Sequence, residues 1–404
     1  MRTNGFALLV GERAPDAARE AARRVDRYSK GVVVSTGGEF RELEGARLSG
    51  KRDVVIAYSL GGGGFPLVHG SSVDAGAHEG EFSILGRGAS GFYGARDPLG
   101  TRGLWVVERG PGAGSMASDY RLLRRGAALQ APGTTYADGD AKSAAPKRPQ
   151  ARAPRSFEEA ARELASLIDE AVKRRVRGQG RVAVSFSGGL DSSLLAAVAS
   201  RHAEVVLCSA YAAGARDERQ SDRAAALLGL RLESTTLEEE PLVEAARSAE
   251  LPPGDSTAMD EALWCIYSAT SGLAAANGAR TIVLGQLADE LFGGYMKYAL
   301  AAKEKGAREA ERMMREDVRG CADRGFLRDE AACSASCEVR FPYADESIAS
   351  FAAGLPFDYK VRDGERKAVL RAAALELGLP EELAAAPKKA AQFSSGAARL
   401  LKRR

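Results

Sequence analysis

Residues 182–195, VAVSFSGGLDSSLL, constrain the fold of this 404-residue chain more than any other stretch. An apolar run leads into a loop of serine and glycine, and an acid and two further serines then begin a run of helix-forming residues. This order predicts a buried strand that ends at Phe186, a tight loop, and a helix that begins near Asp191 to Ser193. Glycines allow close backbone approach, and the free N–H groups at a helix N-terminus attract anions. The stretch therefore predicts a phosphate site.

The side chains of this loop narrow the phosphate chemistry. A Walker A loop carries a lysine that contacts the transferred phosphates, and residues 187–193, SGGLDSS, have none. They carry hydroxyls and Asp191 instead, which suits a magnesium ion that bridges phosphate oxygens. A helix N-cap after a glycine turn is the purely structural alternative. The heptapeptide resembles the pyrophosphatase-type loop of enzymes that cleave ATP between its α and β phosphates, which implies AMP and pyrophosphate as products.

Strands and helices alternate around this loop, and the alternation predicts an α/β fold. Such alternation is typical of a parallel sheet with helices on both faces. Beyond Leu291 the apolar spacing is mostly helical. We expect strands over 181–186, 204–210 and 281–286, and helices over 156–176, 191–200, 217–229 and 258–277.

The N-terminal part has a different pattern. Short apolar segments alternate with glycine-rich turns at 31–35, 53–60 and 103–108, which predicts a smaller strand-rich domain with one helix near 15–28. The run Gly61 to Gly64 lacks the spacing of a dinucleotide loop and is interpreted as a hairpin tip. The expected division is a first domain over 1–140, a linker rich in Ala, Pro, Lys and Arg over 141–155, and a second domain over 156–404.

Composition excludes several classes of protein. The net charge is +3, from 57 basic and 54 acidic residues, which is not the balance of a dedicated nucleic-acid binder. No apolar run reaches the roughly 20 residues of a membrane span. The apolar stretch at 6–11 is too short for a signal peptide, so we expect a cytoplasmic protein. From the charge balance and the short apolar runs we expect no nucleic-acid or membrane partner. The expected partners are small-molecule substrates. The five cysteines form no CxxC pair, and no histidine lies near Cys321, Cys333 and Cys337, so we interpret the cysteines as small buried residues rather than as metal ligands.

Further segments resemble one family, the asparagine synthetases and their relatives. Residues 285–295, GQLADELFGGY, resemble that family's GEGADELFGGY, and residues 338–345, EVRFPYAD, resemble ExRxPFxD. Residues 366–371, RKAVLR, followed by PKKAAQFSSG, resemble its C-terminal lysine segment. The resemblance extends over 156–404 and implies an adenine nucleotide alpha hydrolase-like fold for the second domain, with ATP and Mg²⁺ as cofactors. A homodimer is one expected assembly.

The resemblance assigns roles to individual residues. Asp191 and Asp289 would hold the magnesium ion that neutralises the departing pyrophosphate, and Lys367 would stabilise that group and the adenylated intermediate. A solvent-facing helix lysine is the structural alternative for Lys367. The implied ATP-binding residues are Phe186, Ser187, Gly188, Gly189, Asp191, Ser192, Ser193, Ala212, Leu284 and Gly285, and Gln286 is counted among the catalytic positions.

The first domain resembles the Ntn-type glutamine amidohydrolase domain of the same family, less closely. The similar segments are GFYGARDPLGTRGLWV at 91–106, MASDYRLL at 116–123 and PGTTY at 132–136, which are scaffold segments. Glutamine-using relatives expose a cysteine at the second position as the nucleophile, whereas this sequence has Arg2 there and its nearest cysteine is Cys208. We therefore expect a degenerate domain without glutaminase activity. A misassigned start codon is the alternative.

The second departure from the family pattern is Gln286, where the family has a glutamate associated with adenylate formation and amide formation. A glutamine can donate hydrogen bonds but cannot act as a base. Leu287 replaces the glycine beside it and is expected to narrow the loop. The sequence therefore supports the part of the site that binds ATP better than the part that binds the acceptor substrate.

Three hypotheses follow. The first is an ATP-dependent amide ligase that adenylates a carboxylate, with aspartate as the first candidate, and uses free ammonia. The second is a ligase similar to the β-lactam synthetases, in which the amine belongs to the substrate itself and needs no ammonia. The third is a nucleotide-binding pseudoenzyme, against which the joint presence of Ser187, Asp191, Asp289 and Lys367 argues. A tRNA-modifying ligase is disfavoured because no basic RNA-binding segment or catalytic cysteine pair is present.

Overall fold

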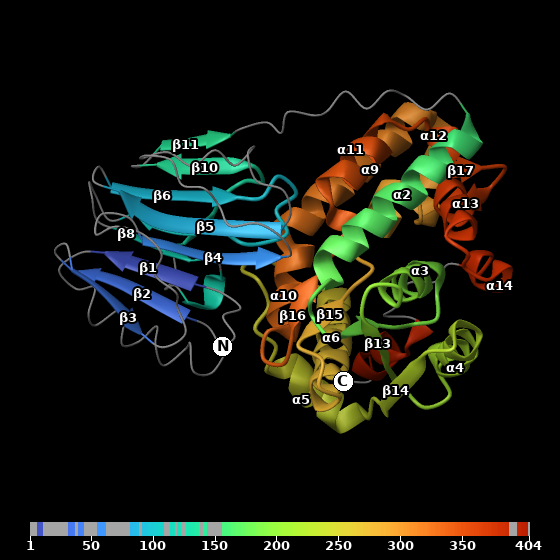
Figure 1. Cartoon of the computed structure of the whole chain (residues 1–404), viewed down its shortest axis with the longest axis horizontal. Helices are drawn as coiled ribbons and strands as arrows, with labels where there is room; N and C mark the ends of the chain where they lie inside the picture. Colours follow the sequence, from blue (N-terminus) through green and yellow to red (C-terminus); the bar gives the residue numbers. More distant parts are fainter. Residues whose placement is uncertain are drawn as a thin grey trace. The chain divides into compact units, whose positions relative to one another are not determined.

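The computed structural model describes residues 6–10, 31–36, 39–43, 55–61, 81–88, 91–108, 114–117, 119–122, 127–137, 140–143, 156–387 and 394–402 (Figure 1). Two compact units are distinguished, one of Met1–Lys147 with Ala322–Ala335 and one of Arg148–Cys321 with Ser336–Arg404. The segment Ala322–Ala335 thus clusters with N-terminal residues, whereas the sequence placed it in the range 156–404. The expected helix over 15–28, residues 62–64 and Arg2 lie outside the described residues.

The first unit is strand-rich, as predicted. Its two sheets have the strand orders β3-β2-β1-β8-β7-β9 and β11-β10-β6-β5-β4. Within these sheets β1 and β2 are parallel and the other neighbours are antiparallel. Because β1 also contacts β4 and β5, the two sheets pack on each other. The strands are β1 (Phe6–Val10), β2 (Gly31–Thr36), β3 (Glu39–Leu43), β4 (Val55–Gly61), β5 (Glu81–Gly88), β6 (Gly91–Arg96), β7 (Trp105–Glu108), β8 (Gly114–Ala117), β9 (Ala128–Leu129), β10 (Thr134–Ala137) and β11 (Asp140–Ser143), the last of which extends into the range expected as a linker.

Buried charged residues join the segment Ala322–Ala335 to this unit. The Arg96 guanidinium donates to the carbonyl oxygens of Arg102 and Ala322, each at 2.6 Å. Arg102 forms an ion pair of 3.0 Å with Glu330 on α10 (Phe326–Cys333), and both side chains are buried. Charges are seldom buried unless they are paired and hydrogen-bonded, so these contacts fix α10 as part of the first unit.

The second unit contains the predicted parallel sheet. Its strand order is β14-β13-β12-β15-β16, and every neighbouring pair is parallel. Neither edge strand was predicted, because the sequence of β14, RLESTT, lacks an apolar run and β16 has only the three residues EVR. The expected strand over 281–286 ends at Val283. The strands are β12 (Arg181–Ser185), β13 (Glu204–Tyr211), β14 (Arg231–Thr236), β15 (Thr281–Val283) and β16 (Glu338–Arg340).

Helices cover both faces of this sheet (Figure 1). α3 (Leu190–Ala199) and α4 (Arg216–Leu228) connect β12 to β13 and β13 to β14, while α6 (Ala258–Ala276) leads back to β15 on the other side of β12. Because crossovers between parallel strands are right-handed, α3 and α4 lie on one face and α6 on the opposite face. The predicted fold class is confirmed. The remaining helices are α2 (Phe157–Val176), α5 (Glu239–Arg247), α7 (Ala288–Phe292), α8 (Met296–Lys305), α9 (Ala307–Gly320), α11 (Glu346–Gly354), α12 (Phe357–Lys360), α13 (Ala368–Glu376), α14 (Glu381–Ala384) and α16 (Ala397–Leu401), and β17 (Val361–Arg362) and β18 (Glu365–Arg366) form a hairpin before α13.

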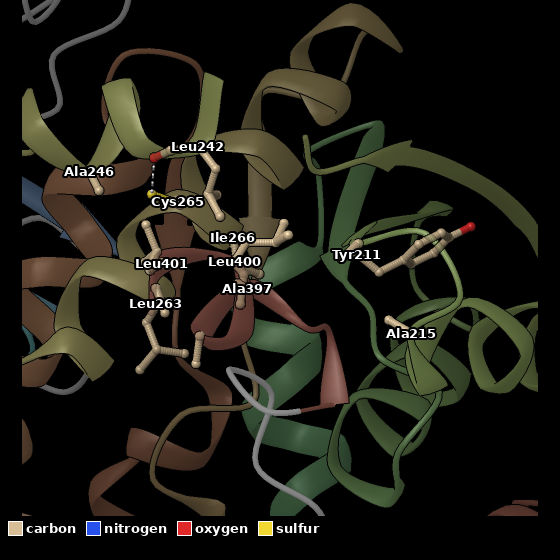
Figure 2. Packing of buried hydrophobic residues seen from close by; sticks show 13 residues of the cluster. Tyr211, Ala215, Leu242, Ala246, Leu263, Cys265, Ile266, Ala397, Leu400 and Leu401 are labelled. Atoms are coloured by element: carbon tan, nitrogen blue, oxygen red, sulfur yellow. Dashed lines mark hydrogen bonds between the residues drawn. The ribbon is translucent and has the colours of Figure 1, made fainter. Parts of the chain in front are cut away.

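The C-terminal helix α16 is anchored in a hydrophobic core. Figure 2 shows Leu400 and Leu401 of α16 together with Ile266 of α6 and Leu242 of α5, and all four side chains are buried. The thiol of Cys265 donates to the Leu242 carbonyl oxygen at 3.7 Å in the same cluster. All five cysteines are buried and unbridged, as predicted. Among the described helices, none has both the length and the apolar character needed to cross a membrane.

Candidate active site

The site lies where the order of the parallel strands changes direction. From β12 the chain moves outward through β13 to β14, and it then returns to β15 on the other side of β12. The loops that follow β12 and β15 therefore diverge at the carboxyl edge of the sheet, which is where ligands bind in open α/β sheets. The loop after β12 is SGG at residues 187–189, and the loop after β15 leads to Asp289 on α7. Both sequence motifs thus meet at one edge.

The loop after β12 has the conformation expected of a phosphate cradle. α3 begins at Leu190 with Gly189 as its N-cap, and the Ser187 hydroxyl accepts a hydrogen bond from the Gly189 amide at 3.4 Å. Gly188 has φ +67°, and a Cβ there would lie 2.5 Å from the carbonyl oxygen of Gln220 on α4. Only glycine fits this position, so Gly188 allows the loop to pack against α4.

Three predicted residues from distant parts of the chain meet beside this loop. The Lys367 ammonium lies 2.6 Å from each Asp191 carboxylate oxygen and 2.7 Å from Oδ1 of Asp289. Its side chain is 1% exposed, which excludes the alternative of a solvent-facing helix lysine. Lys367 also adopts the left-handed backbone region, at φ +61°, as the N-cap of α13. Strained backbone of this kind concentrates at functional sites.

The two carboxylates also fit the implied magnesium ion. Magnesium is usually held by one or two carboxylates together with phosphate oxygens and water, rather than by a full cage of protein ligands. Asp191 and Asp289 lie close enough to share one ammonium group, so their oxygens converge on one small volume beside the loop. Within the described ranges no group of three or more His, Cys, Asp or Glu side chains forms a metal site, so the cation would depend on phosphate oxygens for its remaining ligands.

A glycine that the sequence reading did not single out makes this convergence sterically feasible. A Cβ at Gly294 would lie 1.8 Å from Oδ1 of Asp289 and 2.4 Å from Cε of Lys367. A Cβ at Gly285 would lie 3.2 Å from the Cβ of Asp191. Both glycines belong to the quoted segment GQLADELFGGY, and the double glycine at its end was the available signal.

A pocket opens beside the ammonium group. Five of the residues that line it were predicted from the sequence as site residues, namely Ser187, Gly189, Asp191, Ser192 and Lys367. Sequence reasoning missed the rest of the wall, which comes mainly from Asp217 and Gln220 of α4, Arg371 of α13, and Ala386, Pro387 and Ser394 near the C-terminus. The segment that contains Ser394 is fixed to the unit, because Ser394 donates to Asp217 at 3.0 Å and the Ser395 carbonyl accepts from the Ala212 amide at 2.7 Å.

The positions expected to line the adenine and ribose lie deeper. Phe186, Ala212 and Leu284 are all buried, and Ser193 is fully buried as well. Their backbone amides are also engaged: that of Phe186 donates to Cys208 and that of Leu284 donates to Arg340. These residues are buried and are not among those that line the pocket.

The Gln286 side chain contacts Cys321 and not the cluster formed by Lys367 and the two acids. Its side-chain amide donates to the sulfur of Cys321 at 3.8 Å, at the start of a π-helix over Cys321–Gly325. π-Helical turns are rare and are frequent at functional sites. Leu287, the N-cap of α7, has φ +78° and is 1% exposed. The structure therefore places Gln286 and Leu287 together on the segment that connects β15 to α7.

The segment EVRFPYAD contacts the site through Tyr343. The Tyr343 hydroxyl donates to the backbone carbonyl of Asp191 at 3.2 Å, and Tyr343 is fully buried. Asp345 is the N-cap of α11 and forms ion pairs with Arg174 and Arg175 of α2 at 2.7 and 2.8 Å. Burial alone would raise the pKa of Asp345, but the Arg175 charge and the hydrogen bonds outweigh it and lower that pKa to about 2.

A second acid beside Asp289 was also missed. Glu290 is buried and accepts a hydrogen bond of 2.7 Å from the Tyr295 hydroxyl. Burial and the neighbouring Asp289 charge raise the pKa of Glu290 to about 7. The consecutive acids Asp289 and Glu290 thus have different environments, since Asp289 meets an ammonium group and Glu290 a phenol.

Comparisons with known proteins agree with the resemblance found in the sequence. A sequence model of the family described as Asparagine synthase matches residues 163–325 and 301–403. The putative glutamine-hydrolyzing asparagine synthetase 1 of Methanocaldococcus jannaschii is 29% identical over 280 residues, which cover 61% of this chain and 52% of that protein. The asparagine synthetase domain-containing protein 1 of Mus musculus is 27% identical over 307 residues, which cover 59% of this chain and 49% of that protein.

This chain therefore spans about half the length of the curated relatives it matches. Among solved structures, the NMN synthetase from Francisella tularensis is similar, with a TM-score of 0.33 and 11% sequence identity over 60% of this chain and 78% of that chain.

Proposed function

The chain belongs to the asparagine synthase family, and from this premise we propose that it is an ATP-dependent, carbon–nitrogen bond-forming ligase that releases AMP and pyrophosphate. The observation that carries the proposal is the buried Lys367 ammonium, held between Asp191 and Asp289 beside the serine and glycine loop. A site that only bound a nucleotide would need the loop, whereas this set of charges suits a reaction in which negative charge develops on a leaving group.

In the first step a substrate carboxylate oxygen attacks the α-phosphorus of ATP. The bond from that phosphorus to the bridging oxygen breaks, and pyrophosphate leaves with the electron pair. A magnesium ion held by Asp191 and Asp289 would supply a Lewis acid to the phosphate oxygens. Lys367 neutralises the charge that develops on the leaving group, and the amides of the loop after β12 orient the phosphates.

In the second step an amine attacks the acyl carbon of the adenylate. The carbon–nitrogen bond forms, AMP leaves as the carbon–oxygen bond breaks, and the nitrogen loses a proton. Aspartate is the first candidate acid. Ammonia is the first candidate amine, because the five cysteines of this sequence all lie at or beyond Cys208 and none stands where the glutaminase nucleophile would be expected.

A second candidate reaction uses an amine within the same substrate molecule, as in ligases that close a β-lactam ring. Gln286 supports it, because the side chain that replaces the family's glutamate is an amide and cannot remove a proton from ammonia. A tethered amine reacts without capture of free ammonia, so it places less demand on such a base.

Mass spectrometry of the products tests these alternatives. The protein is incubated with ATP, magnesium and aspartate, with ammonium in one reaction and glutamine in another. Asparagine from ammonium alone would support the first reaction. Asparagine from glutamine would contradict the expectation that the N-terminal domain has no glutaminase activity. AMP and pyrophosphate that depend on aspartate but appear without asparagine would remove ammonia as the amine, and no pyrophosphate release with aspartate would remove aspartate as the acid. ATP binding without pyrophosphate exchange for any acid across a panel would favour a pseudoenzyme.

A further inference from the structure

The pocket beside the serine and glycine loop contains a second cation besides Lys367. Arg371 lies one helical turn after Lys367, on α13, and lines the same pocket as Ser187, Gly189 and Asp191. Because Lys367 and Arg371 both line this pocket, the two cations are presented together. The Lys367 ammonium is already shared by two carboxylates, which leaves one positive charge against two negative ones at that point. At Arg371 a phosphate anion that enters the pocket meets a positive charge whose hydrogen-bond acceptors are neutral carbonyl oxygens.

The hydrogen bonds of Arg371 fix its orientation without neutralising it. Nε donates to the carbonyl oxygen of Arg366 at 2.9 Å, Nη1 donates to that of Ala384, and Nη2 donates to that of Ala386 at 3.1 Å. Backbone carbonyls carry no net charge, so these bonds preorganise the guanidinium and leave its positive charge in place. Each terminal nitrogen of arginine has two N–H groups, and the described bonds use one on each.

The nearest acid to Arg371 is a weak partner. Oε1 of Glu365 lies 3.5 Å from Nε, and the Glu365 side chain is 59% exposed while that of Arg371 is 12% exposed. Solvent-exposed ion pairs contribute little, because water screens the charges and the side chains lose entropy. Since Glu365 faces Nε, the ion pair does not engage the terminal nitrogens that form the guanidinium fork.

We infer that Arg371 is a further ligand of the pyrophosphate leaving group, which it binds through the remaining N–H groups of its two terminal nitrogens. The inference rests on the proposed function and adds a residue to it. A planar guanidinium presents two parallel N–H groups to phosphate oxygens and is well suited to this anion. Because the same group holds the carbonyls of Ala384 and Ala386, bound pyrophosphate also stabilises the wall formed by Pro387.

The test measures the affinity of inorganic pyrophosphate with magnesium, and separately of AMP, by calorimetry on the full chain. Arg371→Gln is expected to weaken pyrophosphate binding about 10-fold or more, the usual effect of losing hydrogen bonds to a charged group. Arg371→Lys keeps the positive charge but loses the pair of parallel N–H groups, so it is expected to lose less pyrophosphate affinity than Arg371→Gln. AMP affinity is expected to stay at the wild-type value in both variants. Arg223→Gln, an exposed arginine on α4 whose partner is Glu382, is the matched control.

A purely structural role would give a different pattern. If Arg371 only supported the wall, both variants would lose pyrophosphate and AMP affinity together, in step with their free energy of unfolding, and the inference would be overturned. It would also be overturned by unchanged pyrophosphate affinity in Arg371→Gln while the wild-type protein binds pyrophosphate. Failure of the wild-type protein itself to bind pyrophosphate with magnesium would instead remove the proposed function on which the inference rests.

Discussion

Gly294→Ala is expected to separate Lys367 from Asp289 without disturbing the backbone. The added Cβ would lie 1.8 Å from Oδ1 of Asp289 and 2.4 Å from Cε of Lys367, whereas nonbonded carbon atoms pack at about 3.5–4.0 Å. Gly294 is not among the glycines with positive φ, so alanine is compatible with the local conformation. The effect therefore comes from the two side chains that the methyl group displaces.

Two magnitudes follow from this geometry. Forcing one methyl group into a packed site typically lowers the free energy of unfolding by about 1–3 kcal/mol. The displacement needed to clear Asp289 is of the order of an ångström, and a misplacement of about 1 Å at a reacting centre can reduce the rate about 100-fold. We therefore expect a folded variant that loses far more activity than stability.

ATP–pyrophosphate exchange measures the activity, and urea denaturation measures the free energy of unfolding. Gly272→Ala is the matched control, because Gly272 lies inside α6 and a Cβ there meets no atom within 4 Å. The control is expected to raise the free energy of unfolding by about 0.5–1 kcal/mol and to leave the exchange rate unchanged. A Gly294→Ala variant that exchanges pyrophosphate at the wild-type rate would refute the reasoning.

Further predictions concern the support and acceptor sides of the site. Tyr343→Phe removes the hydroxyl that donates to the Asp191 carbonyl, so urea denaturation is expected to show a loss of about 1 kcal/mol. The folded-state pKa of Asp345 is lowered from 3.8 to about 2, so its stabilising ion pair with Arg175 is fully present above pH 3.8 and lost as the pH falls toward 2. This loss amounts to about 2 kcal/mol, and Asp345→Asn should flatten that part of the stability profile. Gln286→Glu is expected to change amide formation, measured by mass spectrometry, more than it changes pyrophosphate exchange; equal changes in both would contradict the separation of the two steps.

The sheet of the second unit was predictable because its central strands are short apolar runs bounded by loop residues. Local composition is enough to predict β12 and β13, and the right-handed crossover rule then sets which helices cover which face. β14 escaped prediction because an edge strand with a half-exposed surface needs no apolar run, and RLESTT has none. The sequence pattern therefore predicted buried strands better than the edge of the sheet.

The convergence of the site was predictable only through motifs. Asp191, Asp289 and Lys367 lie far apart in the chain, and no local pattern indicates that they meet. The resemblance supplied the three residues, but not Gly294, whose role appears only when Asp289 and Lys367 are already in place. The same reason applies to α10: the mostly helical spacing beyond Leu291 is consistent with a helix there, but contacts such as the ion pair of Arg102 with Glu330 are needed to reveal which unit the helix joins.

The two departures from the family pattern beside Asp289 have different consequences for chemistry. Leu287 has a left-handed backbone, at φ +78°, a conformation that glycine can adopt without strain and that costs a leucine roughly 1–3 kcal/mol. Burial of its side chain, which is 1% exposed, offsets this by about 2 kcal/mol, so the loop can hold the shape that presents Asp289 to Lys367. Gln286 has no such compensation in chemical terms, because an amide that donates to Cys321 cannot take up the proton that a carboxylate would. A change of acceptor therefore requires only Gln286 and its surroundings to differ, while the charges that would activate ATP stay as the family has them.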